Sequence, residues 1–430
     1  MKVAIVGAGA GGLAAAYDLC AAGHEVVVLE AADYVGGLAA GISTDRWDWS
    51  IERYYHHWFA SDEHMLGLIE ELGWKDQVLF PRPVTVVYHA GEFYALDSPI
   101  AVLRFPALSI FERLRLGMVI AYLKYVAHWQ PLEKETAHDW LRRWIGERPY
   151  EILWKPLLVG KFGPYYQEVN MAWFWARIKA RTPRLGTFDG GFQAFFDKFA
   201  DKIKELGARI ELSTPVHKIE PTEDGRLSVE AGGESHIVDQ CLVTSSPGAL
   251  AKMAPSLTGD YLEQLLELKS MGAIVMILAL KQRLSEQGFY WHNLPKSAGF
   301  PYLSLVEHTN FVSPEHFDGD HLVYVGDYLE QGHEYFNLSD EGLLERFLPP
   351  LEQFNEDFNS DWLKDYWVFR TSYAQPVPPV NHSRSIPDIK TPIEGLWFAS
   401  MSQVYPWDRG TNFAVEIGRR AASEMMRSGS

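Results

Sequence analysis

Cysteine, long apolar runs and basic tracts are all scarce in this sequence. The two cysteines, Cys20 and Cys241, lie far apart in the chain and suggest neither a disulfide framework nor a metal site. No uninterrupted apolar run reaches the length of a membrane span, because charged residues interrupt the best candidate, residues 107–129. No signal peptide precedes the first predicted strand, so we expect a cytoplasmic protein. From the apolar runs and the cysteines, we expect no integral membrane segment and no metal ion.

The charge balance of the chain is acidic. Its 430 residues include 56 Asp and Glu against 39 Lys and Arg, which gives a formal net charge of −17. Such a surface repels the phosphates of a nucleic acid, so we exclude a nucleic-acid partner and expect a small-molecule substrate. The length and the 47% hydrophobic content predict a large core divided between two domains.

The N-terminal stretch predicts a strand, a glycine turn, a helix and a second strand. The apolar run Val3–Val6 leads into the glycine-rich turn 7–12, an alanine-rich segment follows over residues 13–22, and the second run, Val26–Leu29, ends at Glu30. This order is typical of a βαβ dinucleotide site. The cofactor-binding residues predicted here are Gly7, Gly9, Ala10, Gly11, Gly12, Glu30 and Ala31.

Each of these residue types has a physical role at such a site. Gly7 allows the sharp exit from the strand, Gly9 lets the backbone approach a pyrophosphate, and Gly12 lets the helix pack closely on the sheet. The free N–H groups at the helix N-terminus favour phosphate. The Glu30 carboxylate would accept hydrogen bonds from ribose hydroxyls and would repel a 2′-phosphate, which argues against NADP.

A second glycine pair, Gly36-Gly37, follows soon after the acid and suggests a cofactor more extended than NAD. With this pair the sequence resembles the FAD-binding signature of the superfamily of amine oxidases, protoporphyrinogen oxidases and phytoene desaturases. That family usually has an arginine after the pair, where this chain has Leu38. The resemblance implies non-covalently bound FAD, with Leu38 beside it.

The resemblance also implies a fold. We expect an α/β protein with a Rossmann-like FAD-binding domain formed by residues 1–55, 186–255 and 385–430. Residues 56–185 and 256–384 would form a discontinuous α+β substrate domain on an antiparallel sheet. The strands predicted for that sheet are Ala273–Leu280, Gly288–Trp291, Pro301–Glu307, His321–Asp327 and Tyr366–Thr371.

The returning segments carry the other expected cofactor contacts. By resemblance, the backbone of Val216 would meet the adenine after the strand Ala208–Leu212. The start of the last helix would lie at the pyrimidine end of the flavin and stabilise negative charge there. Its predicted contacts are Ser400, Gly410, Thr411, Asn412 and Phe413.

Six residues are candidates for the wall of the substrate cavity. Tyr54 and His56 lie in a dense polar and aromatic segment, and Lys161 lies in Pro156–Tyr165, which resembles a glycine-containing loop of protoporphyrinogen oxidase-like proteins. Tyr373 begins a predicted proline-stiffened connector, Tyr373–Pro379. The remaining candidates are Tyr405 and Trp407, in the loop before the last helix.

One further helix, Leu108–Trp129, has an apolar side that allows two interpretations. Its cationic face is small, so we expect the apolar side to pack in the core. Peripheral contact with a membrane is the alternative.

These features predict an FAD-dependent oxidoreductase that moves a hydride equivalent from an amine, C–H or alcohol carbon to flavin N5. One alternative is a flavin-dependent isomerase similar to UDP-galactopyranose mutase, in which Arg53, Arg177 and Arg181 would bind a nucleotide diphosphate. A polyprenyl or carotenoid desaturase is another. The third class is a flavin-binding scaffold without catalysis.

Overall fold

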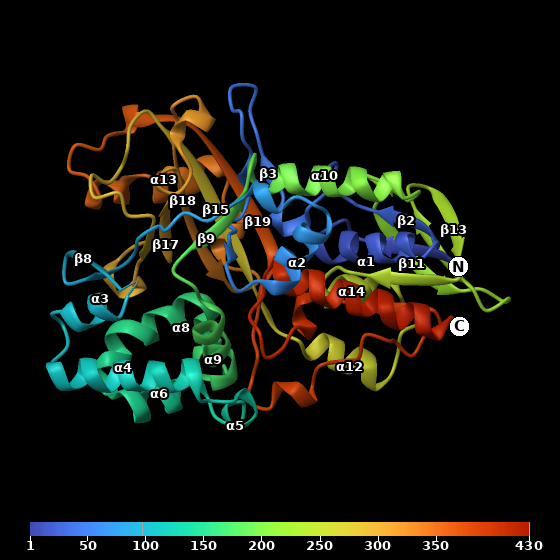
Figure 1. The fold of residues 1–430 in the computed structure, drawn as a ribbon, viewed down its shortest axis with the longest axis horizontal. Helices are drawn as coiled ribbons and strands as arrows, with labels where there is room; N and C mark the ends of the chain where they lie inside the picture. The colour runs from blue at the N-terminus through green and yellow to red at the C-terminus, as the bar shows by residue number, and fades with distance from the viewer. Residues whose placement is uncertain (97, 430) are drawn as a thin grey trace.

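Two sheets at opposite ends of the molecule organise the fold. The computed structural model describes residues 1–96 and 98–429. A parallel sheet lies near both chain termini, a larger sheet lies at the other end, and a group of helices flanks the larger sheet (Figure 1). The predicted α/β class is confirmed.

The parallel sheet has five strands in the order β10-β2-β1-β14-β20. All four strand pairings are parallel. The strands are β1 (Lys2–Val6), β2 (Glu25–Leu29), β10 (Arg209–Glu211), β14 (Gln240–Val243) and β20 (Leu396–Phe398). Cys241 lies in β14 and Cys20 in helix α1 (Ala10–Ala21), and both are buried.

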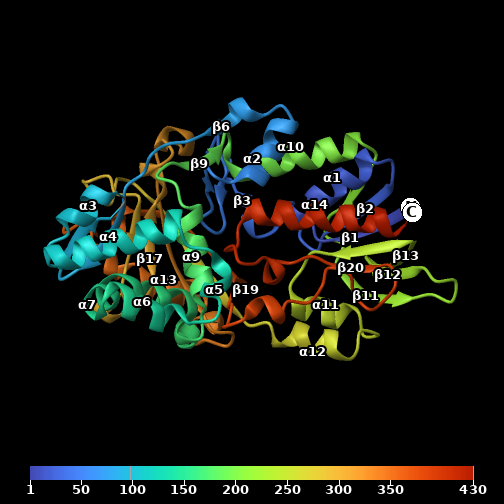
Figure 2. The same ribbon diagram turned by 60° about the horizontal axis from the view of Figure 1, so that its bottom comes forward.

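Alternate residues of β1 enter two different cores. Val3 and Ile5 pack against the helices α1, α10 (Gly191–Glu205) and α14 (Thr411–Ser428). Ala4 and Val6 pack toward a small antiparallel sheet and helix α11 (Pro247–Met253). The small sheet consists of β11 (Val216–Pro221), β12 (Leu227–Ala231) and β13 (Glu234–Val238). Figure 2 shows the three helices above the parallel strands and the small sheet below. The strand period of two therefore gives a three-layer arrangement.

Glycines allow the helices α1 and α14 to touch. A Cβ atom added to Gly418 would lie 2.1 Å from the carbonyl oxygen of Gly11. The first and last helices of the chain are consequently in backbone contact.

The larger sheet has seven strands in the order β19-β15-β18-β17-β16-β7-β8. Its pairings are antiparallel except that of β16 with β7, which is parallel. The strands are β7 (Thr85–His89), β8 (Glu92–Ala95), β15 (Ser270–Leu280), β16 (Trp291–Asn293), β17 (Ser304–Glu307), β18 (His321–Leu329) and β19 (Leu363–Pro376).

Two predictions for this sheet were wrong in position. The strand expected at Gly288–Trp291 begins at Trp291 as β16, since the N–H groups of Tyr290 and Trp291 both bond the carbonyl of Val84, which directly precedes β7. The connector expected at Tyr373–Pro379 is strand through Pro376. A proline is tolerated there because β19 is the outermost strand of the sheet and Pro376 is its last residue.

The predicted loop Pro156–Tyr165 is also not a loop. Its first part belongs to helix α8 (Lys155–Phe162), followed by a 3₁₀ turn at Gly163–Gln167. Gly160 is needed for packing, because a Cβ atom there would lie 2.1 Å from Cδ1 of Leu303 in the neighbouring sheet.

The expected core packing of Leu108–Trp129 was wrong for one side of that helix. Helix α4 (Ile110–Tyr125) buries Leu116 and Leu123 but leaves several large apolar residues in solvent. Among the residues that the structure describes, no helix is both long enough and apolar enough to cross a bilayer.

The remaining elements are short. The helices are α2 (Glu63–Glu71), α3 (Pro99–Arg104), α5 (Trp129–Leu132), α6 (Ala137–Ile145), α7 (Glu147–Pro149), α9 (Met171–Ala180), α12 (Asp260–Glu267) and α13 (Asp340–Phe347). The strands are β3 (Gly41–Ile42), β4 (Ile51–Glu52), β5 (Trp58–Phe59), β6 (Val78–Leu79) and β9 (Leu185–Phe188).

Candidate functional site

The turn between β1 and α1 is packed without room for side chains. Gly7 has φ of +105°, a conformation that favours glycine. A Cβ atom on Gly12 would lie 2.0 Å from the carbonyl oxygen of Gly7, so a larger residue would displace the turn. No side chain caps α1 at its N-cap residue, Gly9. The first N–H groups of this helix are therefore available to an anion.

Glu30 is held rigidly beside this turn. One carboxylate oxygen accepts from the Ala8 N–H at 2.7 Å and the other from the Ala32 N–H at 2.9 Å. Carboxylate oxygens have further lone pairs, so the group can still accept from hydroxyls. The Thr214 N–H donates to the Glu30 carbonyl at 2.7 Å, which brings the chain just before Val216 alongside the acid.

The second glycine pair packs directly on the first turn. The Gly36 N–H donates to the Ala8 carbonyl at 2.9 Å, and Gly9 and Gly36 form an isolated parallel bridge. Gly36 and Gly37 have φ of +108° and +58°. A Cβ atom on Gly9 would meet only the Gly37 Cα within 4 Å, at 3.9 Å. Two side-chain-free backbone segments thus lie side by side.

The start of α14 is fixed through its side chains. Trp58 donates its indole N–H to the Thr411 hydroxyl at 2.9 Å. The Asn412 side-chain oxygen accepts from the His64 and Met65 N–H groups of α2, at 2.9 and 3.0 Å. No side chain caps α14 at its N-cap residue, Gly410, so its first backbone N–H groups are open to a negatively charged ligand.

These parts fit FAD. The glycine backbones suit a close approach by a diphosphate, Glu30 supplies acceptors for ribose, and the uncapped starts of α1 and α14 supply N–H donors. Leu38, next to the second glycine pair, and Arg409, next to the start of α14, line the same cavity. The two ends of the chain therefore meet at one place.

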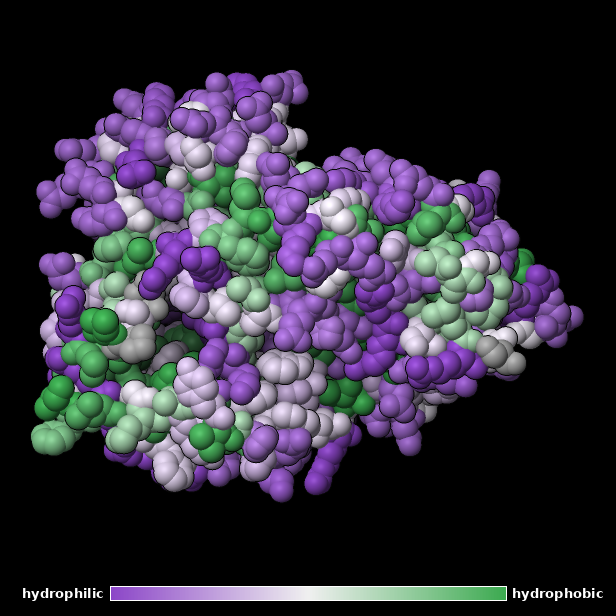
Figure 3. Space-filling view, viewed as in Figure 1, coloured by the Kyte–Doolittle hydropathy of each residue, from purple (hydrophilic) through white to green (hydrophobic). Residues whose placement is uncertain are grey.

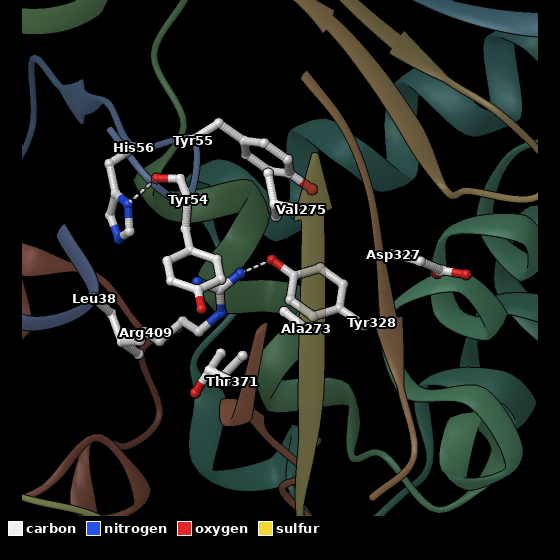
Figure 4. Close-up of a pocket in the computed structure, with 11 residues that line it drawn as sticks. Leu38, Tyr54, Tyr55, His56, Ala273, Val275, Asp327, Tyr328, Thr371 and Arg409 are labelled. Carbon is white, nitrogen blue, oxygen red and sulfur yellow. Dashed lines mark hydrogen bonds between the residues drawn. The ribbon is translucent and has the colours of Figure 1, made fainter. Parts of the chain in front are cut away.

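That cavity, here called the sheet cavity, has a volume of about 390 Å³ and lies against the seven-stranded sheet. Figure 4 shows Arg409 directed toward the Tyr328 hydroxyl, to which it donates a hydrogen bond, with Asp327 pointing away on the far side. The walls of the sheet cavity consist of Leu38, Tyr54, Tyr55, His56, Ala273, Val275, Asp327, Tyr328, Thr371, Ala374 and Arg409.

The predicted residues Tyr54 and His56 both line the sheet cavity. The His56 Nδ1 lies 2.5 Å from the Tyr54 carbonyl oxygen, and burial lowers the pKa of His56 to about 4. His56 is therefore neutral at pH 7. Burial raises the pKa of the Tyr54 hydroxyl, which stays protonated.

A second cavity, here called the turn cavity, has a volume of about 270 Å³ and shares Arg409 with the first. The predicted residues Tyr405 and Trp407 line it. Trp407 stacks on Phe413 with ring centroids 5.4 Å apart, and the Tyr405 hydroxyl donates to Glu133 at 3.2 Å. Its other lining residues include Trp173, Gln375, Pro376, Pro378, His382, Met401, Val404 and Asp408.

Lys161 is buried between these cavities. Its ammonium nitrogen lies 3.1 Å from the side-chain oxygen of Gln375 and 4.8 Å from the ring centroid of Tyr328. Arg409 donates to the same Gln375 oxygen at 2.9 Å and also to the Tyr328 hydroxyl. Burial is the largest cause that lowers the pKa of Lys161 well below its usual value, and Asp408 opposes the shift.

Positive charge exceeds negative charge in this region. Asp408 accepts from the Trp173 indole at 3.0 Å and lies 3.7 Å from Arg177. Burial raises the pKa of Asp408, but the positive charges of Lys161 and Arg177 together leave it lowered. Arg177 lowers the pKa of Arg181 to about 9, and burial lowers that of Arg409 to about 10. The three arginines are charged at pH 7. Of the two carboxylates that line the cavities in the described chain, Asp408 lies beside Arg177, and Asp327 pairs with Lys296 at 2.9 Å.

Like Lys161, the predicted residues Tyr373 and Ser400 do not line either cavity. The Tyr373 hydroxyl lies 2.7 Å from the Ser402 hydroxyl and 3.2 Å from that of Ser400, and it accepts from the Ser402 N–H at 2.9 Å. Ser400 is buried, and its hydroxyl also accepts from the Ser402 N–H, at 3.2 Å. Both residues fix the turn after β20 to strand β19.

Sequence reasoning did not select several lining residues. Tyr328 and Gln375 lie in strands β18 and β19, and no motif marks them, whereas Tyr55 lies between the selected Tyr54 and His56 in the loop from β4 to β5. Arg409 was recognisable in principle, because it directly precedes the helix start that the sequence predicts. Within the described part of the chain, no group of three or more His, Cys, Asp or Glu side chains is placed to hold a metal ion.

Comparison with known proteins agrees with this geometry. The family model described as flavin containing amine oxidoreductase matches residues 10–426. The 15-cis-phytoene desaturase of Narcissus pseudonarcissus is 25% identical over 93% of this chain and 75% of its own length. The cyclohexylamine oxidase of Brevibacterium oxydans IH-35A has a similar structure, with a TM-score of 0.74 and 18% identity over 99% of both chains. An oxidoreductase from Methanosarcina mazei also gives 0.74, at 19% identity over 99% of this chain and 100% of its own. Since the family model spans nearly the whole chain, this protein is an FAD-dependent oxidoreductase that belongs to the family of flavin-containing amine oxidoreductases.

Proposed function

We propose that this enzyme dehydrogenates a C–H substrate that carries no positive charge, and that it is not an amine oxidase. The observation that carries the proposal is the excess of positive charge at the cavities. Arg409 lines both of them, and Arg177 lies beside Asp408 in the turn cavity. A protonated amine about 6 Å from one such arginine would be disfavoured by about 3 kcal/mol at an effective dielectric of about 20.

The remainder of the sheet cavity suits an apolar substrate. Tyr54, Ala273 and Val275 contribute ring and aliphatic surface to its wall. Bound FAD supplies the acceptor for a hydride equivalent. The chain would orient the substrate against this wall, keep water out, and hold negative charge at Arg409 and the open N–H groups of α14. The similarity to 15-cis-phytoene desaturases supports carbon–carbon desaturation.

We further propose the division of labour expected from the sequence. Residues 1–55, 186–255 and 385–430 would form a Rossmann-like FAD-binding domain. In it, the turn from Gly7, Glu30 and Val216 would hold the adenosine half and the start of α14 the flavin half. Residues 56–185 and 256–384 would form the substrate domain. Tyr54, His56, Lys161, Tyr405 and Trp407 would act at the cavities, and Tyr373 with Ser400 would position the turn beside them.

A second candidate function rests on the arginines. Arg177 and Arg181 interact electrostatically with each other, and the Asp408 carboxylate lies 3.7 Å from Arg177. Such a pair would bind the diphosphate of a nucleotide sugar, as in a flavin-dependent mutase. Arg53 fits this role less well, because its guanidinium stacks 3.7 Å from the ring centroid of Tyr34.

An anaerobic reduction experiment tests these functions. The oxidised enzyme would be mixed with 15-cis-phytoene in detergent, with cyclohexylamine, or with UDP-galactopyranose, and its flavin absorbance followed. We expect bleaching by the polyene and none by the amine. Bleaching by the amine would overturn the proposal, and turnover of the nucleotide sugar only after dithionite reduction would establish the mutase. No response in any arm would indicate a non-catalytic flavoprotein.

A further inference from the structure

A large apolar surface covers one side of the helical region. Ten of the fifteen large apolar residues that are exposed in the described chain fall between residues 100 and 144. We call this surface the α3–α4 face. Figure 3 shows apolar side chains gathered over α3 and α4 at the lower left. Its members are Ile100, Leu103, Ile110, Phe111, Leu114, Met118, Tyr122, Tyr125, Val126 and Trp144.

The spacing in α4 makes this face continuous. Phe111, Leu114, Met118, Tyr122 and Tyr125 are separated by three or four residues, so they share one side of the helix. Phe111 is 81% exposed, Met118 67% and Tyr125 79%. Another side of α4 buries Leu116 and Leu123, so this helix carries apolar residues on its solvent side as well as on its buried side. Such a helix is normally enclosed by protein or lipid.

The neighbouring elements extend the face rather than cover it. Ile100 and Leu103 belong to α3, and Arg113 of α4 donates to the Leu103 carbonyl at 2.6 Å. Arg115 of α4 donates to the Trp144 carbonyl at 2.7 Å, which places that residue at the edge of the face. A large aromatic side chain has about 150–250 Å² of surface. Summed over its ten exposed residues, the α3–α4 face therefore exposes an apolar area on the order of 1,000 Å², well above that of an ordinary surface patch.

The charge of this segment is opposite to that of the protein. Residues 99–129 contain four Lys and Arg and one Glu, a net charge of +3 in a chain of −17. The single acid, Glu112, accepts from the Ser109 N–H at 2.7 Å in the helix cap. Arg113, Arg115 and Lys124 bond backbone carbonyls, and no described carboxylate forms an ion pair with them. Their positive charge is therefore not neutralised within the described protein.

We propose that the α3–α4 face binds the surface of a lipid bilayer that contains anionic headgroups. Apolar and aromatic side chains would enter the interface between headgroups and acyl chains, and the cations would lie at the headgroup level. A self-association face would explain the apolar surface equally, but it would bring the positive charges of two copies together. This inference concerns the surface alone and stands independently of the substrate proposed above.

Vesicle flotation of the flavin-loaded full chain tests the proposal. The protein would be mixed with vesicles of phosphatidylcholine, or of phosphatidylcholine with phosphatidylglycerol, at low and high salt. We expect flotation with the anionic vesicles, weakened by salt and by omission of the anionic lipid. The variant Phe111→Ser/Met118→Ser/Tyr125→Ser should lose affinity by at least about tenfold, since three large side chains leave the interface.

A matched variant controls for the loss of surface hydrophobicity in general. Leu206→Ser/Leu212→Ser/Leu266→Ser removes three exposed leucines outside the α3–α4 face and should float like the wild type. The flavin spectrum and circular dichroism would verify the fold of both variants. Failure of the wild type to float would overturn the proposal, as would equal loss in the two variants. A wild-type dimer that does not float, made monomeric by the first triple substitution, would identify a self-association face instead.

Discussion

At the scale of single residues, we expect Glu30 to set how tightly the adenosine half of the cofactor is held. Its two carboxylate oxygens accept from the Ala8 and Ala32 N–H groups. We expect Glu30→Ala to weaken FAD binding by roughly 10- to 100-fold, because hydrogen bonds to charged groups contribute about 1.5–3 kcal/mol. Titration of the deflavinated variant with FAD, followed by fluorescence quenching, measures the effect.

A neighbouring acid provides the control for Glu30. Glu25 begins the same strand, β2, and is exposed. Glu25→Ala should leave the dissociation constant of FAD unchanged. Equal losses in the two variants would show that net charge, and not the position of Glu30, determines affinity.

Glu52 makes stability depend on pH. It is 2% exposed, one oxygen accepts from the Phe192 N–H at 3.0 Å, and burial raises its pKa to about 7. The folded state therefore holds a proton that the unfolded state releases above pH 4.5. The free energy of unfolding therefore falls by an amount on the order of 3 kcal/mol as the pH rises from 4.5 to about 7.

Glu52→Gln should remove this dependence. The amide oxygen can still accept from Phe192, and the group no longer ionises. As the pH rises from 5 to 8, we expect the free energy of unfolding of the variant to increase by about 2–3 kcal/mol relative to that of the wild type, measured by denaturant unfolding. Parallel stability curves for the two proteins would contradict the assignment.

At the scale of elements, Asn412 joins the start of α14 to α2. Its side-chain oxygen accepts two backbone N–H groups, those of His64 and Met65. Asn412→Ala leaves both donors without that partner, so we expect a loss of about 1–2 kcal/mol in the free energy of unfolding and lower flavin content. Thermal unfolding and the ratio of absorbance at the flavin and protein bands give the two measurements.

Asn412→Asp is the matched variant. A carboxylate keeps the acceptor and lies at the N-terminus of α2, where negative charge is favourable. It should retain most of the stability that alanine loses. If the aspartate and alanine variants are equally unstable, the amide group of Asn412 has a role other than as an acceptor.

Elements differ in how well the sequence predicts them. The hairpin of β12 and β13 turns at Gly232 and Gly233, a glycine pair that signals a turn in the sequence, and both glycines have positive φ. Helix α8 was mistaken for a loop, since Gly160 and Gly163 are read as turn signals. In the folded protein Gly160 is a packing residue, required by the nearby Leu303 of another element. No local pattern carries that information.

At the scale of the whole molecule, the cofactor connects the two ends of the chain. We expect the adenosine side to lie near Glu30 and the flavin side at the start of α14. FAD at about 1,000 times its dissociation constant should stabilise the deflavinated protein by about 4 kcal/mol. Differential scanning fluorimetry measures the corresponding rise in melting temperature.

ADP distinguishes the two halves of the site. ADP occupies only the adenosine part. At the same concentration as FAD, it should therefore raise the melting temperature by less than FAD does. An equal rise with ADP would show that the start of α14 contributes no binding energy to the flavin half.

The sequence alone determined the cofactor site, because that site depends on backbone geometry. Glycines at positions 7, 9, 12, 36 and 37 and an acid at the end of β2 define it locally, and each has a direct steric or charge requirement. The same βαβ pattern accounts for the parallel pairing of β1 with β2.

Tertiary structure alone decided the charge of the cavities and the exposure of α4. Arg177, Asp408 and Arg409 come from two distant segments, and only folding shows that one carboxylate faces several cations. The apolar residues of α4 have the same composition whether they are buried or exposed. Their position at the edge of the fold, where no other described element covers Phe111 or Tyr125, leaves them in solvent. Both features depend on what surrounds a side chain, and the sequence records only the side chain itself.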